Sequence, residues 1–202
     1  MDNFKSQLKK SLSKYSKDEF IDNYVKNEFL SKNGDANIYL KIKNKDEIFD
    51  SRTINNQLDL KSSFYSFIEE KTDMLENDVK INLHIIGYKF SEEEQKLIKN
   101  MIKEHYGIDL YLAQKEYKEK RNKMIYMFLT GLMCVVAYLL IYLKTDFEFF
   151  LEVFGLIFSF SLWEACDIYI YELSDIKDER EEVCQNLLMN VYFDNDLKED
   201  TK

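Results

Sequence analysis

Residues 124–143 read MIYMFLTGLMCVVAYLLIYL, which is 20 residues without one charged side chain. As an α-helix rising about 1.5 Å per residue, this segment is about 30 Å long, the thickness of the hydrocarbon core of a bilayer. It is apolar around its whole circumference, whereas the core helix of a soluble protein usually has one polar side. A chain of 202 residues could hardly enclose this helix and a second one like it. The segment therefore predicts a membrane-spanning helix.

A second apolar stretch predicts a second span over residues 149–168, after a short connection at 144–147. Its uncharged part, 153–163, has only 11 residues and is too short to cross a bilayer alone. Paired with the first span through the short connection, it becomes the antiparallel half of a hairpin. Glu152 then lies at the outer interface and Glu164 at the inner one. The sequence thus predicts a transmembrane helical hairpin, with the lipid bilayer as its partner.

The distribution of Lys and Arg predicts the orientation of this hairpin. The connection between the spans contains only Lys144. Cations instead precede the first span and follow the second: Lys115, Lys118, Lys120, Arg121, Lys123, Lys177 and Arg180. Because cytoplasmic loops carry an excess of Lys and Arg, we expect a multi-pass protein of the cell membrane with both termini in the cytoplasm.

Acidic side chains at the inner end of the second span form the most unusual local pattern. Glu164, Asp167 and Glu172 would face the basic residues that precede the first span. The expected ion pairs join Arg121 to Glu164 or Asp167, and Lys118 or Lys120 to Glu172. Such pairs would hold the register of the hairpin. Alternatively, an ionisable group at membrane depth marks an ion pathway or a partner site, and Glu164 is then the best candidate because it lies deepest.

Small residues recur on both predicted spans and suggest close helix packing. Thr130, Cys134 and Ala137 lie on one side of the first helix, and Gly155 and Ser159 form a small-xxx-small pair on the second. Such positions let helix backbones approach closely. The sequence alone does not decide whether they serve the hairpin itself or an oligomer.

The rest of the chain predicts a small α/β domain. Apolar residues alternate over 38–42 and 79–86, the pattern of half-buried strands. Helical spacing predicts helices over 4–31, 58–75 and from Ser91 onward, with capping boxes at Ser16–Glu19 and Ser91–Glu94 and an interruption at Gly107. Weaker strand patterns occur at 47–53 and 191–193. If the latter pairs with the others, the C-terminal tail returns across the hairpin to complete the same sheet.

The predicted fold class is therefore α+β, a small cytoplasmic mixed sheet with packed helices plus the two-helix transmembrane hairpin. The expected organisation is an N-terminal helical segment, a cytoplasmic α/β domain, a charged juxtamembrane helix, the hairpin, and a cytoplasmic acidic helix with a returning strand at 190–193 and a disordered tail: residues 1–33, 34–110, 111–123, 124–168 and 169–202.

Composition and the absence of known motifs disfavour several functional classes. The net charge of −9 disfavours a nucleic-acid partner, because Lys and Arg contacts to phosphate dominate that affinity. Cys134, Cys166 and Cys184 have no zinc-site spacing, and neither His84 nor His105 has a partner at ligand distance in sequence. Phosphate-binding glycine loops and hydrolase motifs are absent. We therefore expect no catalytic residues, no cofactor and no metal.

The end of the second span carries a resemblance. Its Trp163-Glu-Ala-Cys-Asp167 sequence, the aromatic run that follows and Glu172 resemble a group of uncharacterised bacterial two-span membrane proteins. The layout of strand, charged helix and hairpin matches as well, over roughly residues 79–193. Members usually carry Arg after the last Glu, where this chain has Leu173 and Ser174. The resemblance implies a two-span topology and no activity.

Two functions are compatible with these features. The first is a non-enzymatic, membrane-anchored interaction or signalling module whose cytoplasmic domain binds a protein partner or a second copy. The second is an oligomeric membrane effector, as in stress or phage defence, that opens a pore or disrupts the bilayer when its cytoplasmic domain is triggered. An enzyme that uses Glu164, Asp167 and Glu172 is a third and weaker hypothesis, because the chain lacks a recognisable nucleophile or set of metal ligands.

Overall fold

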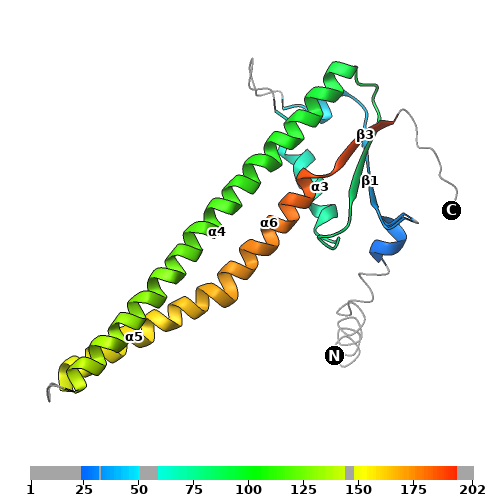
Figure 1. The fold of residues 1–202 in the computed structure, drawn as a ribbon. Helices are drawn as coiled ribbons and strands as arrows, with labels where there is room; N and C mark the ends of the chain where they lie inside the picture. Colours follow the sequence, from blue (N-terminus) through cyan, green and yellow to red (C-terminus); the bar gives the residue numbers. More distant parts are fainter. Residues whose placement is uncertain (1–23, 32, 51–58, 144–147, 195–202) are drawn as a thin grey trace, which may run out of the picture. The chain divides into compact units, whose positions relative to one another are not determined.

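A computed structural model of the chain describes residues 24–31, 33–50, 59–143 and 148–194 (Figure 1). The chain divides into two compact units, Met1–Gly107 with Cys184–Lys202, and Ile108–Val183. Its elements, in chain order, are β1 Ala36–Ile42, the 3-10 helix η1 Lys45–Glu47, α3 Ser62–Thr72, β2 Ile81–Gly87, α4 Glu92–Tyr142, α5 Glu148–Asp167, the π-helix η3 Ile168–Glu172, α6 Leu173–Leu187 and β3 Asn190–Asp194.

The three strands form one parallel sheet in the order β1-β2-β3. The returning strand expected near the C-terminus is therefore present, and it pairs with β2 so that Leu83 lies opposite Val191. The expectation of a mixed sheet was wrong. Each strand is connected to the next through helices, α3 in the first connection and the long helices in the second. Such crossover connections return the chain to the same end of the sheet, which makes the strands parallel.

One face of the sheet forms the core of the first unit. Ile38, Ile81, Leu83 and Ile85 are all 1% exposed or less. They alternate along their strands, as the period of two in the sequence predicted. Fully buried side chains of the helices complete this core: Ile68 of α3 and Ile98, Ile102 and Tyr106 of α4. The core consists mainly of branched aliphatic side chains between one sheet face and the helices.

The start of α4 confirms the predicted capping box. The backbone N–H of Ser91 donates to Glu94 Oε2 at 2.9 Å, and the backbone N–H of Glu94 donates to Ser91 Oγ at 3.3 Å. The interruption expected at Gly107 does not occur, because α4 continues without a break to Tyr142. A side chain at Gly107 would meet no atom within 4 Å, so nothing there requires a glycine turn.

Several other predicted elements differ in extent from those observed. Helix α3 begins at Ser62 and ends at Thr72, inside the predicted 58–75. In the described part of the weak strand predicted at 47–53, the structure has the end of η1 and an antiparallel bridge between Phe49 and Leu60, and residues 51–53 lie outside the described residues. Residues 24–28 are helical. The capping box at Ser16, the connection at 144–147 and the tail after Asp194 lie outside the described residues.

Gln185, near the end of α6, ties this helix to the connection between α3 and β2. Its Nε2 donates to the carbonyl oxygens of Glu76 at 2.8 Å and Val79 at 2.7 Å. The side chain is buried, and the neighbouring Asn186 is only 1% exposed. Two hydrogen bonds from one amide therefore position the end of α6, which two residues separate from the start of β3.

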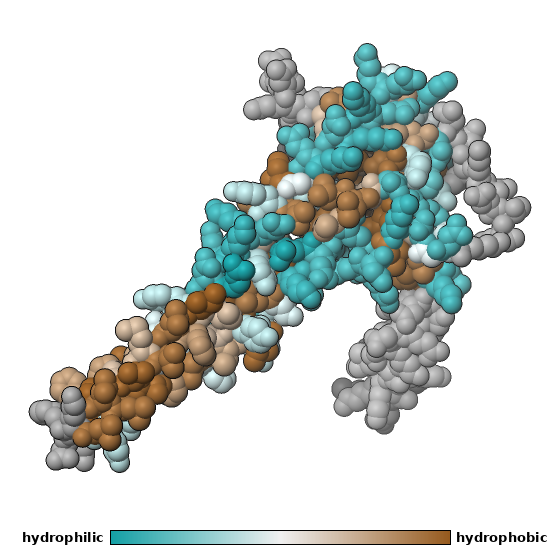
Figure 2. Space-filling model, viewed as in Figure 1, coloured by the Kyte–Doolittle hydropathy of each residue, from teal (hydrophilic) through white to brown (hydrophobic). Residues whose placement is uncertain are grey.

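The second unit contains two helices that are long and apolar enough to cross a membrane, one in α4 and one that begins in α5. Only 11% of the most apolar window of each helix is buried. Figure 2 shows their hydrophobic side chains as a nearly continuous brown surface on the face drawn. A core helix of a soluble protein would instead be mostly buried. The exposed apolar surface therefore supports the assignment of both helices as candidate spans.

Candidate functional site

The basic residues before the first span meet the acidic residues at the end of the second. Lys123 Nζ lies 2.6 Å from Glu164 Oε1, and Lys120 Nζ lies 2.6 Å from Glu172 Oε2. Lys120 and Lys123 are three residues apart on α4, so they share one face of the helix. The two ion pairs therefore form a ladder along the contact between the helices.

The observed pairs differ in part from those expected. Lys120 with Glu172 is one of the two alternatives predicted for that carboxylate. Glu164, however, pairs with Lys123 and not with Arg121. Lys123 was not among the partners predicted from the sequence. Arg121 and Lys118 are exposed, and Asp167 is half-buried. Successive residues on a helix are about 100° apart, so Arg121 cannot share the face used by Lys120. This helical phase is the signal that could have identified Lys123.

The ladder extends across a π-helix. Residues 168–172 form η3 between α5 and α6, so Glu164 lies before the change in helical pitch and Glu172 at its end. Single π-helical turns of this kind occur frequently at functional sites.

The hydrogen bond from Lys120 to Glu172 raises the pKa of Lys120 above its usual value, with a further contribution from the charge of Glu172. Farther along, the Arg180 guanidinium lies 4.7 Å from the centroid of the Tyr117 ring.

The second candidate site is the sheet face opposite the core. The register places Tyr39, His84 and Tyr192 side by side on β1, β2 and β3. The His84 ring stacks between the two tyrosine rings, with centroids 4.9 Å from Tyr39 and 5.1 Å from Tyr192. His84 Nδ1 also lies 2.7 Å from Asp194 Oδ2. Tyr39 is 49% exposed and Tyr192 45%, so this row of rings reaches solvent.

A row of asparagines lies next to the aromatic row. Asn82 Nδ2 donates to Asn37 Oδ1 at 3.2 Å, and Asn190 Nδ2 donates to Asn82 Oδ1 at 3.0 Å. The three amides thus form a ladder across all three strands, which requires the in-register parallel pairing. Parallel sheets usually have both faces covered by apolar layers. A face of amides, rings and a histidine–carboxylate pair is instead suited to binding through hydrogen bonds and ring contacts.

From the sequence, His84 was expected to have no partner at ligand spacing, and this polar face was not predicted. Alternation along each strand does place Tyr39 and His84 opposite the core residues. It does not give the register between strands, and a shift by one residue would separate the rings. The stacking of Tyr39, His84 and Tyr192 therefore depends on the pairing of the strands, which the sequence alone does not give.

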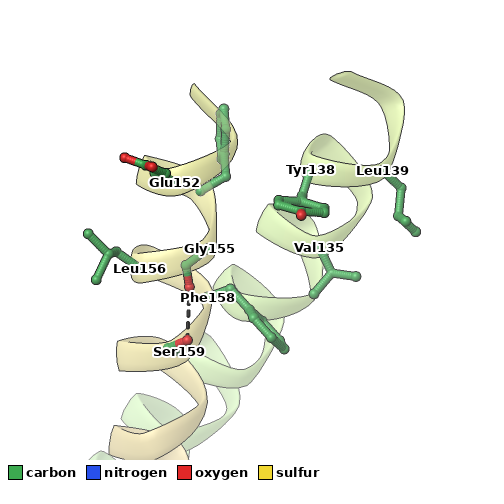
Figure 3. A pocket seen from close by; sticks show the side chains of 9 residues that line it. Val135, Tyr138, Leu139, Glu152, Gly155, Leu156, Phe158 and Ser159 are labelled. Carbon is green, nitrogen blue, oxygen red and sulfur yellow. Dashed lines mark hydrogen bonds between the residues drawn. The ribbon is translucent and has the colours of Figure 1, made fainter. Parts of the chain in front are cut away.

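The contact between α4 and α5 is close at one point and open at another. A side chain at Gly131 would lie 3.3 Å from Leu162 Cδ2 and 3.5 Å from Ser161 Cβ, so Gly131 provides the close approach. A Cβ added at Gly155, in contrast, would meet no atom within 4 Å. Gly155 lies beside a groove of about 750 Å³ that Tyr138 and Phe158 line, with Glu152 on the side of α5 away from α4 (Figure 3). Ser159 Oγ donates to the carbonyl of Gly155 at 2.9 Å.

Within the described ranges, no group of three or more His, Cys, Asp or Glu side chains could hold a metal ion. None of the known protein families, curated proteins or solved structures compared with the chain matches it significantly. The resemblance to bacterial two-span proteins stays a prediction.

Proposed function

We propose that this protein is a non-enzymatic, membrane-anchored interaction module. The observation that carries the proposal is that only 11% of the most apolar window of each of the two long apolar helices is buried. Exposed apolar surface of this extent is unfavourable in water and favourable in lipid. The hairpin formed by α4 and α5 would thus be the anchor, and the α/β unit would be the part that binds.

The orientation of the anchor follows from charge. Lys120 and Lys123 precede the first span, and their ion pairs to Glu172 and Glu164 support a hairpin whose two ends would lie at the same membrane level. The excess of cations at this level supports, through the positive-inside rule, a cytoplasmic position of both termini. The polar sheet face around His84 would then be available to a cytoplasmic protein partner. Acidic composition makes nucleic acid an unfavourable partner.

Membrane anchoring can be tested by fractionation of cells that express the full chain. We expect the chain to stay in the membrane pellet after extraction with alkaline carbonate and to dissolve only in detergent. A reporter that is fluorescent only in the cytoplasm should be active on either terminus, and alkaline phosphatase on either terminus should be inactive. A monodisperse monomer in buffer without detergent would refute the proposal.

The alternative function, an oligomeric membrane effector, is favoured by one observation. The hairpin packs through Gly131 and leaves the pair Gly155 and Ser159 beside an open groove. A small-xxx-small pair that the hairpin itself does not use remains available for a second copy. If the effector function holds, induced expression should depolarise the membrane in a dye assay, and Gly155→Leu should abolish the effect while Gly107→Ala should not. No depolarisation under any inducing condition would exclude it.

A further inference from the structure

Strand β3 forms one edge of the sheet, and a groove follows this edge. Among the described residues, β3 pairs with β2 on one side and with no strand on the other. A groove of about 250 Å³ is lined by residues of α4, the end of α6 and β3: Lys99, Ile102, Lys103, Leu187, Met189, Asn190, Val191 and Tyr192. An edge strand presents unpaired backbone N–H and C=O groups, and a groove between such an edge and a helix can receive an added peptide strand.

The charge of the groove indicates the kind of segment that fits. Its lining contains Lys99 and Lys103 and no carboxylate, although the chain as a whole carries a net charge of −9. The two lysines are four residues apart on α4, so they point to the same side of the helix. Lys99 Nζ also lies 5.6 Å from the centroid of the Phe193 ring, which places its charge over the end of β3.

Apolar side chains at this edge are also incompletely covered. Val191 and Phe193 point to the core side of the sheet but are only half-buried, and Leu188 just before the strand is 72% exposed. The equivalent positions on the central strand, Leu83 and Ile85, are 1% exposed or less. A further strand beside β3 would cover the edge residues in the way that β2 is covered by its two neighbours.

We propose that β3 and its groove bind an extended acidic segment of a partner protein, which adds to the sheet as a fourth strand. The proposal rests on the proposed interaction function and names its partner class. Backbone hydrogen bonds to β3 hold the segment, its apolar side chains cover Val191 and Phe193, and its carboxylates meet Lys99 and Lys103. A second copy fits less well, because its own β3 offers only one carboxylate, Asp194, which is already paired with His84.

The test measures fluorescence anisotropy of labelled peptides with the full-length chain in lipid nanodiscs. The probe is the six-residue peptide Glu-Thr-Val-Thr-Glu-Thr, whose Glu and Val side chains lie on one face of a strand, and its matched control has Lys in place of Glu. We expect the acidic peptide to bind and the basic one not to bind. Two further acidic peptides are methylated at alternate backbone nitrogens, one in each frame, and at least one should lose binding because N-methylation removes strand hydrogen bonds.

The matched variants are Lys103→Glu, in the groove, and Lys96→Glu, which is exposed on α4 outside it. Charge reversal at Lys103 should weaken the affinity for the acidic peptide by about 5-fold, the upper range for an exposed ion pair. Charge reversal at Lys96 should change this affinity by less than about 2-fold. High salt should weaken binding to the unaltered chain, which tests the charge argument even if a variant misfolds.

Three results would overturn the proposal. The first is equal binding of the acidic and basic peptides, or no binding of either. The second is full binding of both methylated peptides. The third is a disulfide-linked dimer formed by Tyr192→Cys and not by the unaltered chain, which would show that a second copy occupies the edge. If the chain still fractionates with membranes, each of these results leaves the anchor intact and removes only the docking surface.

Discussion

Replacement of Gln185 tests how the C-terminal strand is held in the sheet. The Nε2 of this buried side chain donates two hydrogen bonds, to the carbonyls of Glu76 and Val79. Each such bond contributes about 1 kcal/mol, so Gln185→Met, which keeps the volume and removes the donor, should cost about 2 kcal/mol. Gln185→Glu should cost more, because a carboxylate would face the same two carbonyl oxygens.

The measurement is hydrogen exchange of the β3 amides by mass spectrometry, with the chain in nanodiscs. A loss of about 2 kcal/mol corresponds to about 30-fold faster exchange through opening of this region. The control, Glu179→Gln, changes an exposed residue of α6 and should leave exchange in β3 unchanged. If exchange in β3 is the same in Gln185→Met as in the unaltered chain, these two hydrogen bonds do not hold the strand and the reasoning fails.

Three further predictions concern the hairpin and the start of α4. Lys123→Glu and Glu164→Lys should each reduce the yield of folded protein in detergent, and the double exchange should recover it, whereas equal loss in the double variant would show that the pair is not coupled. Gly131→Leu should separate the two helices, seen as increased reactivity of engineered cysteine pairs, because even a Cβ there lies 3.3 Å from Leu162. The hydrogen bond from Lys45, followed by that from the Ser91 backbone, holds the pKa of Glu94 below its usual value. A lowered pKa in the folded state gives stability that is present above the unfolded pKa and lost as the pH falls. Because Glu94→Gln lacks this contribution, the pH midpoint of its acid unfolding should be higher than that of the unaltered chain. An unchanged midpoint would contradict this.

Local patterns in the sequence were sufficient for much of the architecture. The period of two predicted strands at 38–42 and 79–86, and the spacing of Ser91 and Glu94 predicted the helix start. The uncharged run at 124–143 predicted the first candidate span. These features depend on the fit between a residue and its own secondary structure, which the sequence expresses directly.

The pairings between distant segments required the tertiary structure. Strand register decided that Tyr39, His84 and Tyr192 form one stacked row, and helical phase decided that Glu164 pairs with Lys123. Helix packing likewise decided that the two helices approach closely at Gly131 and not at Gly155. Each of these outcomes depends on a shift of one residue along a strand or 100° around a helix. Composition and periodicity are unchanged by such shifts, so only the packed structure distinguishes them.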